Sequence, residues 1–305
     1  MIENILTVGN YVLILFILIG VGVISRKTKI LTNASTKELT NFVLYIVTPC
    51  VIVNSYQREF DRTMLNGLII TVVAAILSFA VHILITHLLV HDIDKRREKT
   101  LRFGSVFSNC GYMSLPLQSA MLGEEGVFYG ATYVAIFQIV LWTYGVVLMS
   151  GSFKNVSVKK IILNPGVSGT VVGFLLFVFS IHLPSTILEP VKFLAALNTP
   201  IPMIIVGFHL AGASFKIKGL SAYTAIILRL FVAPLTMLLG LYLCGVRGVV
   251  LVASVIAASA PFAAATTMFS EKFGADTELS ATCVSVTTLL SIITMPIIVG
   301  IAAML

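Results

Sequence analysis

Ten stretches of about 20 mostly apolar residues follow one another along this chain, and they limit the folds open to it. An α-helix needs about 20 such residues to cross a bilayer. Apolar residues make up 58% of the 305 residues and charged residues only 11%, against about 25% charged in soluble proteins. We therefore expect an all-α membrane protein with ten transmembrane helices, roughly at 5–25, 36–56, 64–90, 100–121, 126–150, 161–181, 190–214, 219–244, 247–270 and 277–303.

The basic residues lie mainly on one side of this arrangement. Most of the 20 Lys and Arg follow the odd-numbered stretches, and the other side holds only Arg58, Arg62, Lys192 and Arg247. Cytoplasmic loops carry such an excess of positive charge. The pattern predicts a multi-pass protein of the cell membrane with both termini outside, surrounded by lipid, and the net charge of +7 does not indicate a nucleic-acid partner.

Neither export signals nor cofactor motifs stand out. Met1-Ile-Glu-Asn4 has no basic residue, so we expect no cleavable signal peptide. The four cysteines lie within apolar stretches without Cys-x-x-Cys or Cys/His spacing, so we interpret them as reduced packing residues rather than disulfide or metal-site residues. We expect no metal and no other cofactor.

The fourth stretch contains the sequence Ser108-Asn109-Cys110-Gly111-Tyr112-Met113-Ser114-Leu115-Pro116. Pro116 has no N–H for the carbonyl group of Tyr112, and Gly111 tolerates unusual backbone angles. A helix interrupted here leaves polar main-chain groups unpaired, which hydrocarbon does not tolerate unless protein, water or a solute satisfies them. The segment predicts a binding site for a polar solute, formed by Asn109, Cys110, Gly111 and Tyr112.

The second half of the chain repeats this order of interruptions. Thr48-Pro49 in the second stretch corresponds to Thr199-Pro200 in the seventh, and Pro116 in the fourth corresponds to Pro261 in the ninth. Because five stretches is an odd number, the second half enters the bilayer from the opposite side. We expect an inverted repeat of residues 1–153 and 154–305, and interrupted helices at matching positions mark a central transport site. Ser259 and Ala260 belong to this site.

Arg229 is the one ionised residue expected near the middle of the bilayer, and no Asp or Glu lies at the centre of any stretch. Burying an Arg there costs about 2.5 to 3.5 kcal/mol on insertion scales. Two interpretations stay open. In the first, Arg229 makes the cavity electropositive or contacts an anionic solute. In the second, its guanidinium is satisfied by helix carbonyl groups, or the side chain snorkels toward the inner membrane surface because the helix starts later than expected.

Two other ionisable features have alternative interpretations. His82 lies inside the third stretch, and we expect a packed histidine with one hydrogen-bond partner rather than a proton carrier. Glu124 and Glu125 could form an acid/base pair. We expect instead a solvated turn, because acidic residues favour the positive end of the next helix.

The helix dipoles indicate which solute the site takes. Where the fourth and ninth stretches break, the N-terminal end of each second segment carries about half a positive charge. Both ends point to the middle of the membrane, so a small anion such as a carboxylate benefits, with the side-chain amide of Asn109 donating a hydrogen bond. The alternative for Asn109 is a cap that bonds its own backbone.

The chain resembles the auxin efflux carrier family, which includes plant PIN exporters and bacterial malonate and malate permease-like proteins. Asn109 to Pro116 is similar to the family's Asn-x-x-x-Met-Gly-x-Pro motif, with Ser114 in place of the usual Gly. Further similarity lies at 202–210 and 261–274. The resemblance implies that the fourth and ninth helices cross at Pro116 and Pro261, that Asn109 binds a carboxylate, and that a homodimer works by an elevator-like motion.

Together these features predict a secondary transporter that moves a small organic anion by alternating access. Proton or sodium coupling is left open. The alternative is a membrane sensor that binds a small carboxylate without transporting it. We expect no enzyme, because the chain has no buried carboxylate pair, HExxH or GxSxG.

Overall fold

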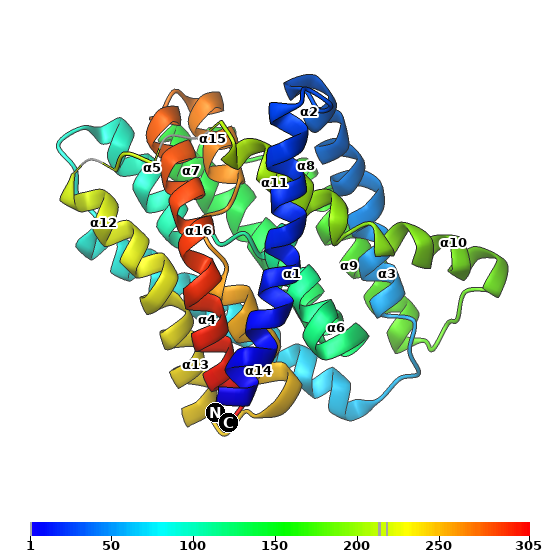
Figure 1. Ribbon diagram of the computed structural model, residues 1–305. Coiled ribbons are helices and arrows are strands. Elements are labelled where there is room, and N and C mark those ends of the chain that lie inside the picture. Colours follow the sequence, from blue (N-terminus) through cyan, green and yellow to red (C-terminus); the bar gives the residue numbers. More distant parts are fainter. Residues whose placement is uncertain (1, 213–214, 218) are drawn as a thin grey trace.

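The computed structural model describes residues 2–212, 215–217 and 219–305, and in these residues it is a bundle of helices without a β-sheet (Figure 1). Met1, the end of the predicted seventh span (213–214) and Lys218 lie outside the described residues. The helices are α1 (Ile2–Lys27), α2 (Asn33–Phe42), α3 (Thr48–Ser55), α4 (Arg62–Leu89), α5 (Lys95–Val106), α6 (Leu115–Val140), α7 (Val146–Ser150), α8 (Val158–Ile162), α9 (Pro165–Val178), α10 (Ser185–Ala196), α11 (Pro200–Leu210), α12 (Leu220–Ile227), α13 (Ala233–Leu243), α14 (Gly248–Ser259), α15 (Ala265–Phe273) and α16 (Thr277–Ala302).

Several helical segments are long and apolar enough to cross a bilayer. In the described part of the chain, 7 segments are long and apolar enough to cross a membrane, and α9 and α14 are shorter apolar helices. One of the 7 covers 41 residues, Cys110–Ser150, and a straight helix of that length would measure about 60 Å, twice the hydrocarbon thickness. Gly123 interrupts it with φ 64° and ψ −152°. The chain is therefore a multi-span membrane protein, and the count of ten spans stays a prediction.

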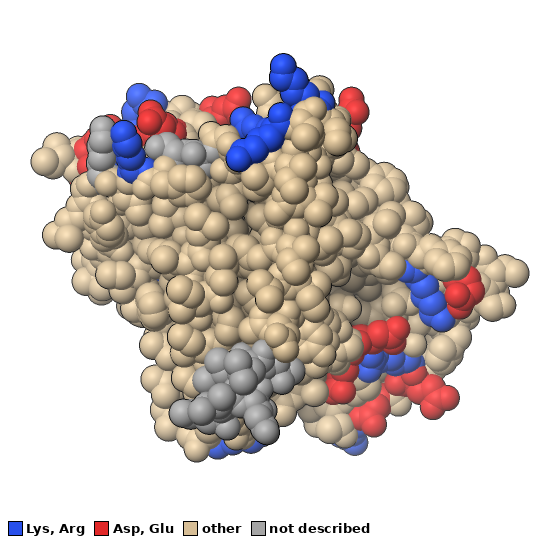
Figure 2. Space-filling view, viewed as in Figure 1, with Lys and Arg blue, Asp and Glu red and all other residues tan. Residues whose placement is uncertain are grey.

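Charged side chains lie at the ends of the bundle. Figure 2 shows a wide belt without Lys, Arg, Asp or Glu across the visible face, and charged groups along its upper rim and at the lower right. The N- and C-terminal ends of the chain lie close together at the end opposite the α1–α2 turn (Figure 1). An uncharged belt of this kind suits contact with lipid.

Three prolines are accommodated in the helices by π turns. Thr48, Leu115 and Ala233 each donate their N–H to the carbonyl oxygen five residues earlier, and a proline follows each of them. Directly before each proline, which has no N–H, the hydrogen bond thus reaches five residues back instead of four, and the helix continues through the proline. This corrects the position of the expected break near Pro116: the chain is helical from Cys110 through Pro116 as far as Gly123, and the interruption lies earlier, at 107–109.

Two helix pairs make close backbone contact. Helix α1 lies along α11, where a methyl group at Gly22 would overlap the carbonyl oxygen of Ile204. Helix α9 lies along α3, where a methyl group at Gly169 would meet the Cα of Pro49 at 3.4 Å. Small residues let membrane helices approach this closely. Because the hydrophobic effect does not drive helices together in lipid, van der Waals packing at such contacts stabilises the pairs.

Candidate functional site

Two interrupted helices cross and bond to each other in the core of the bundle. The first interruption separates α5 from the π turn Cys110–Ser114 that leads into α6, and the second separates α14 from α15. Ser108 and Phe262 form an antiparallel β-bridge. The N–H of Asn109 donates to Pro261 O at 2.8 Å, and the N–H of Ala263 donates to Phe107 O at 2.9 Å. Main-chain groups that each interruption leaves unpaired are thus satisfied by the other.

Arg229 binds the C-terminal ends of both first segments. Its side chain is 2% exposed. Nη1 donates to Ser105 O at 3.3 Å and to Val106 O at 3.0 Å, at the end of α5. Nη2 donates to Ala258 O, at the end of α14. One guanidinium therefore bridges two negative helix ends.

Side chains from the second segment of the first interrupted helix satisfy further carbonyl groups of α14. The hydroxyl group of Ser114 donates to Ile256 O at 3.2 Å, and Nε2 of Gln118 donates to Ala253 O at 2.8 Å. Both side chains are fully buried. These bonds fix α6 beside α14, so the two interrupted helices form one unit around the crossing.

The N-terminal ends at the crossing carry the complementary positive charge. The main-chain N–H groups of Cys110, Gly111 and Tyr112 begin a helix and have no preceding helical acceptor. The Asn109 side chain is 6% exposed and makes no cap hydrogen bond to this helix. A methyl group at Gly111 would have no heavy atom within 4 Å. This side of the crossing thus offers donors together with space.

A cavity of about 300 Å³ lies beside the helix that follows the crossing, and the crossing residues 107–114 and 258–263 are not among its lining residues. Leu115 and Ser119 line it, one and two turns after Gly111 on roughly the same helix face. The rest of its lining comes from α3, from α6 and from the α10–α11 region. Its polar members are Asn54, Ser55, Ser119, Glu124, Lys192, Asn198 and Thr199.

The other residues that the sequence predicted for the site lie in or beside the crossing. Ala260 and Pro261 lie buried in the crossing itself, and Cys110 is a buried free thiol. The hydroxyl group of Ser259 donates to Val255 O of its own helix at 2.7 Å. Pro116 lies in the first turn of α6.

The prolines of the second and seventh stretches lie in or next to elements that line the cavity, but are not lining residues themselves. Pro49 lies in the first turn of α3, and Pro200 begins α11 directly after the 197–199 turn. Helix α3 and this turn both contribute lining residues. Asn198 was not among the residues predicted for the site; its side-chain Oδ1 is buried and has no hydrogen-bond partner among the described residues. Its place directly before Thr199-Pro200 was the available signal.

The other ionisable groups take structural positions. Nδ1 of His82 lies 2.8 Å from Ser78 O and the ring is 3% exposed, in agreement with a packed histidine with one partner. Glu124 lies at the surface, 3.8 Å from Arg58, and its Oε1 accepts from Asn54 at 3.4 Å. Within the described residues, no group of three His, Cys, Asp or Glu could hold a metal ion.

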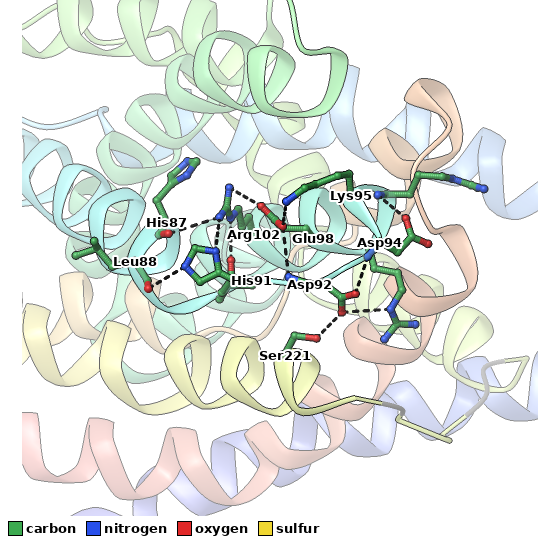
Figure 3. Close-up of polar contacts among 12 residues, drawn as sticks. His87, Leu88, His91, Asp92, Asp94, Lys95, Glu98, Arg102 and Ser221 are labelled. Atoms are coloured by element: carbon green, nitrogen blue, oxygen red, sulfur yellow. Dashed lines mark hydrogen bonds and ion pairs between the residues drawn. The ribbon is translucent and has the colours of Figure 1, made fainter.

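A polar network ties the α4–α5 turn to α12 (Figure 3). Asp92 accepts from the Ser221 hydroxyl at 2.5 Å and from Nε of Arg97 at 3.3 Å. Buried Glu98 pairs with Lys95 at 2.8 Å and with Arg102 at 2.9 Å. The network holds the α4–α5 turn, α5 and α12 together, on the side of α5 away from the crossing.

Opposing effects act on the pKa of Asp92. Burial raises it, but the hydrogen bond from Ser221 and the charge of Arg97 outweigh burial and hold the pKa below its ordinary value of 3.8. Asp92 is therefore ionised at neutral pH and contributes to the network as an anion.

Comparison with known proteins gives a consistent result over the whole chain. The sequence matches the membrane transport protein family over residues 7–159 and 152–299. It is 27% identical to an uncharacterized transporter of Methanocaldococcus jannaschii over 296 residues, 93% of this chain and 95% of that protein. It is 23% identical to an uncharacterized transporter of Methanothermobacter thermautotrophicus over 293 residues, 94% and 95% of the two chains.

Proposed function

This chain belongs to the membrane transport protein family, and from that membership we propose that it is a secondary transporter of a small organic anion with one carboxylate at the crossing. The carboxylate binds the N-terminal end of the helix that starts at Cys110, beside the side-chain amide of Asn109. The cavity that begins at Leu115 is its path to one side of the membrane.

The observation that carries the proposal is the division of charge at the crossing. Arg229 bonds the C-terminal ends of α5 and α14, whose partial charges of about −0.5 each it offsets. The two N-terminal ends, each about +0.5, keep their charge. The crossing therefore has an excess of about one positive charge, which favours a monovalent anion.

The packing of the helices supports alternating access by an elevator-like motion. Helices α1, α3, α9 and α11 pack as the pairs α1–α11 and α3–α9, and these pairs pack in turn against α16 and α6, which lie with α4, α5, α12 and α14 around the crossing. The α1–α11 pair joins the first span of one half to the second span of the other, and the α9–α3 pair does the reverse. This reciprocal packing supports the inverted repeat of 1–153 and 154–305. A homodimer with both termini outside the cell is part of the proposal.

Flux measurements test the proposal. Purified protein is first screened by thermal shift against mono- and dicarboxylates, and the stabilising acid is then supplied in labelled form to proteoliposomes. We expect time-dependent, saturable uptake, and greater stabilisation by monocarboxylates than by amides of the same size. Binding without uptake would favour a sensor, and the absence of stabilisation by any carboxylate would contradict the anion site.

A further inference from the structure

Arg229 takes a position that other broken-helix transporters give to an ion. The guanidinium bonds Ser105 O, Val106 O and Ala258 O, at the C-terminal ends of two interrupted helices. In broken-helix transporters, carbonyl groups at such ends coordinate Na⁺ or take part in proton coupling. Among the described residues, the guanidinium of Arg229, a cation attached to the chain, occupies this position at the helix ends.

The neighbourhood offers little to a second cation. The hydrogen bonds of Arg229 go to main-chain carbonyl groups and not to a carboxylate, and no metal-binding group of three residues occurs in the described part of the chain. The carbonyl groups that a sodium ion would need are already accepting from Arg229, Ser114 and Gln118. A nearby guanidinium also repels any further positive ion.

From this geometry we infer that Arg229 acts as a built-in cation in place of a coupling sodium ion, so that this protein carries its anion without Na⁺. The inference rests on the proposed function for the identity of the cargo. It assigns Arg229 to positioning: the guanidinium holds two helix ends together and offsets their charge, and does not contact the solute.

Thermal unfolding of the purified full-length protein tests this role without any organic anion. The wild type and Arg229→Ala are unfolded at equal ionic strength in about 50 mM NaCl, guanidinium chloride or choline chloride. We expect the wild-type Tm to agree within about 1 °C among the three salts. Arg229→Ala should have a lower Tm that free guanidinium raises saturably by about 3 °C or more, with a smaller gain from Na⁺.

A matched control separates this from a general effect of removing an arginine. Arg247 also donates to main-chain carbonyl oxygens, of Tyr242 and Val246, but at an exposed helix end. Arg247→Ala should gain nothing from guanidinium, because water replaces the lost donor. Arg229→Lys keeps a tethered charge and should be less stable than the wild type yet insensitive to Na⁺.

Three results would overturn the inference. These are saturable stabilisation of the wild type by Na⁺ over choline, an Arg229→Ala protein that no cation stabilises, or an Arg229→Lys protein that Na⁺ stabilises saturably over choline. If Arg229→Ala does not fold, the wild-type and Arg229→Lys results decide. Since none of these measurements uses a carboxylate, failure here leaves the anion-transport proposal to its own flux test.

Discussion

Asn109 donates its main-chain N–H to the carbonyl oxygen of Pro261 at 2.8 Å, so its part in the crossing does not depend on its side chain. The side-chain amide makes no cap hydrogen bond to the helix that follows. The backbone of Asn109 thus joins the interrupted helices, and the proposed carboxylate site uses its side-chain amide.

Replacing Asn109 by Ala should therefore reduce transport without unfolding the protein. A hydrogen bond to a charged group contributes about 1.5 to 3 kcal/mol, so we expect a roughly 10-fold to 100-fold weaker carboxylate affinity. Uptake into proteoliposomes measures the effect, and thermal unfolding checks the fold. Ser259→Ala is the control, since that hydroxyl bonds its own helix, and its uptake should stay within about twofold. Normal uptake by Asn109→Ala would place the site elsewhere.

The contact between α1 and α11 gives a stability prediction. A methyl group at Gly207 would overlap the carbonyl oxygen of Ile19, and one at Gly22 would overlap that of Ile204. Because both obstacles are backbone atoms, Gly207→Ala and Gly22→Ala should each destabilise the protein by about 1 to 3 kcal/mol. Gly20 lies on the same helix with nothing within 4 Å of an added methyl group. Gly20→Ala should therefore unfold at the wild-type temperature, and equal losses from all three variants would contradict close packing here.

The crossing shows what the sequence could and could not predict. Interrupted helices were predictable, because Gly and Pro in an apolar stretch leave polar backbone groups that lipid does not satisfy. The position of the first interruption was not. Pro116 sits in a continuous helix because the N–H of Leu115 bonds Cys110 O across a π turn, and no composition rule signals such a turn.

Arg229 shows a second limit. Its burial was predictable from its place within an apolar stretch, but its partners are carbonyl groups, which every residue carries. Only the fold brings the ends of α5 and α14 within reach of one guanidinium. Asn198 was overlooked for a similar reason. An Asn beside Thr-Pro indicates a turn, and only the folded chain shows that Asn198 also lines a cavity.

The network at the α4–α5 turn gives a prediction on pH. Folding lowers the pKa of Asp92 below 3.8, so the folded protein binds fewer protons than the unfolded chain. Its stabilising contribution is complete above about pH 3.8, the ordinary value, and is lost as pH falls through the lower folded value. Asp92→Asn should lower the Tm by roughly 3 °C at pH 7. The difference from the wild type should shrink at a pH below 3.8.

The control for this pH prediction is Glu38→Gln, which removes an exposed carboxylate of α2. Its Tm should match the wild type at both pH values. A wild-type advantage over Asp92→Asn that persists at the lower pH would show that Asp92 acts through packing rather than through its charge.

The charged residues at the mouth of the cavity give a final prediction. Lys192 and Glu124 both line the cavity and are exposed. An anionic solute is attracted by the first and repelled by the second, and such steering changes association rates more than it changes stability. Lys192→Gln should slow uptake about two- to threefold at low ionic strength, and Glu124→Gln should speed it by a similar factor. Both effects should shrink at about 0.5 M salt, where screening shortens the reach of surface charges to a few ångströms. Initial uptake rates at two salt concentrations measure these effects.

The control for this prediction is Glu189→Gln. Lys192 pairs with Glu189 at 2.9 Å, so this change breaks the pair but keeps the cation. If both variants at the mouth slowed uptake equally at every salt concentration, charge would not guide the solute into this cavity.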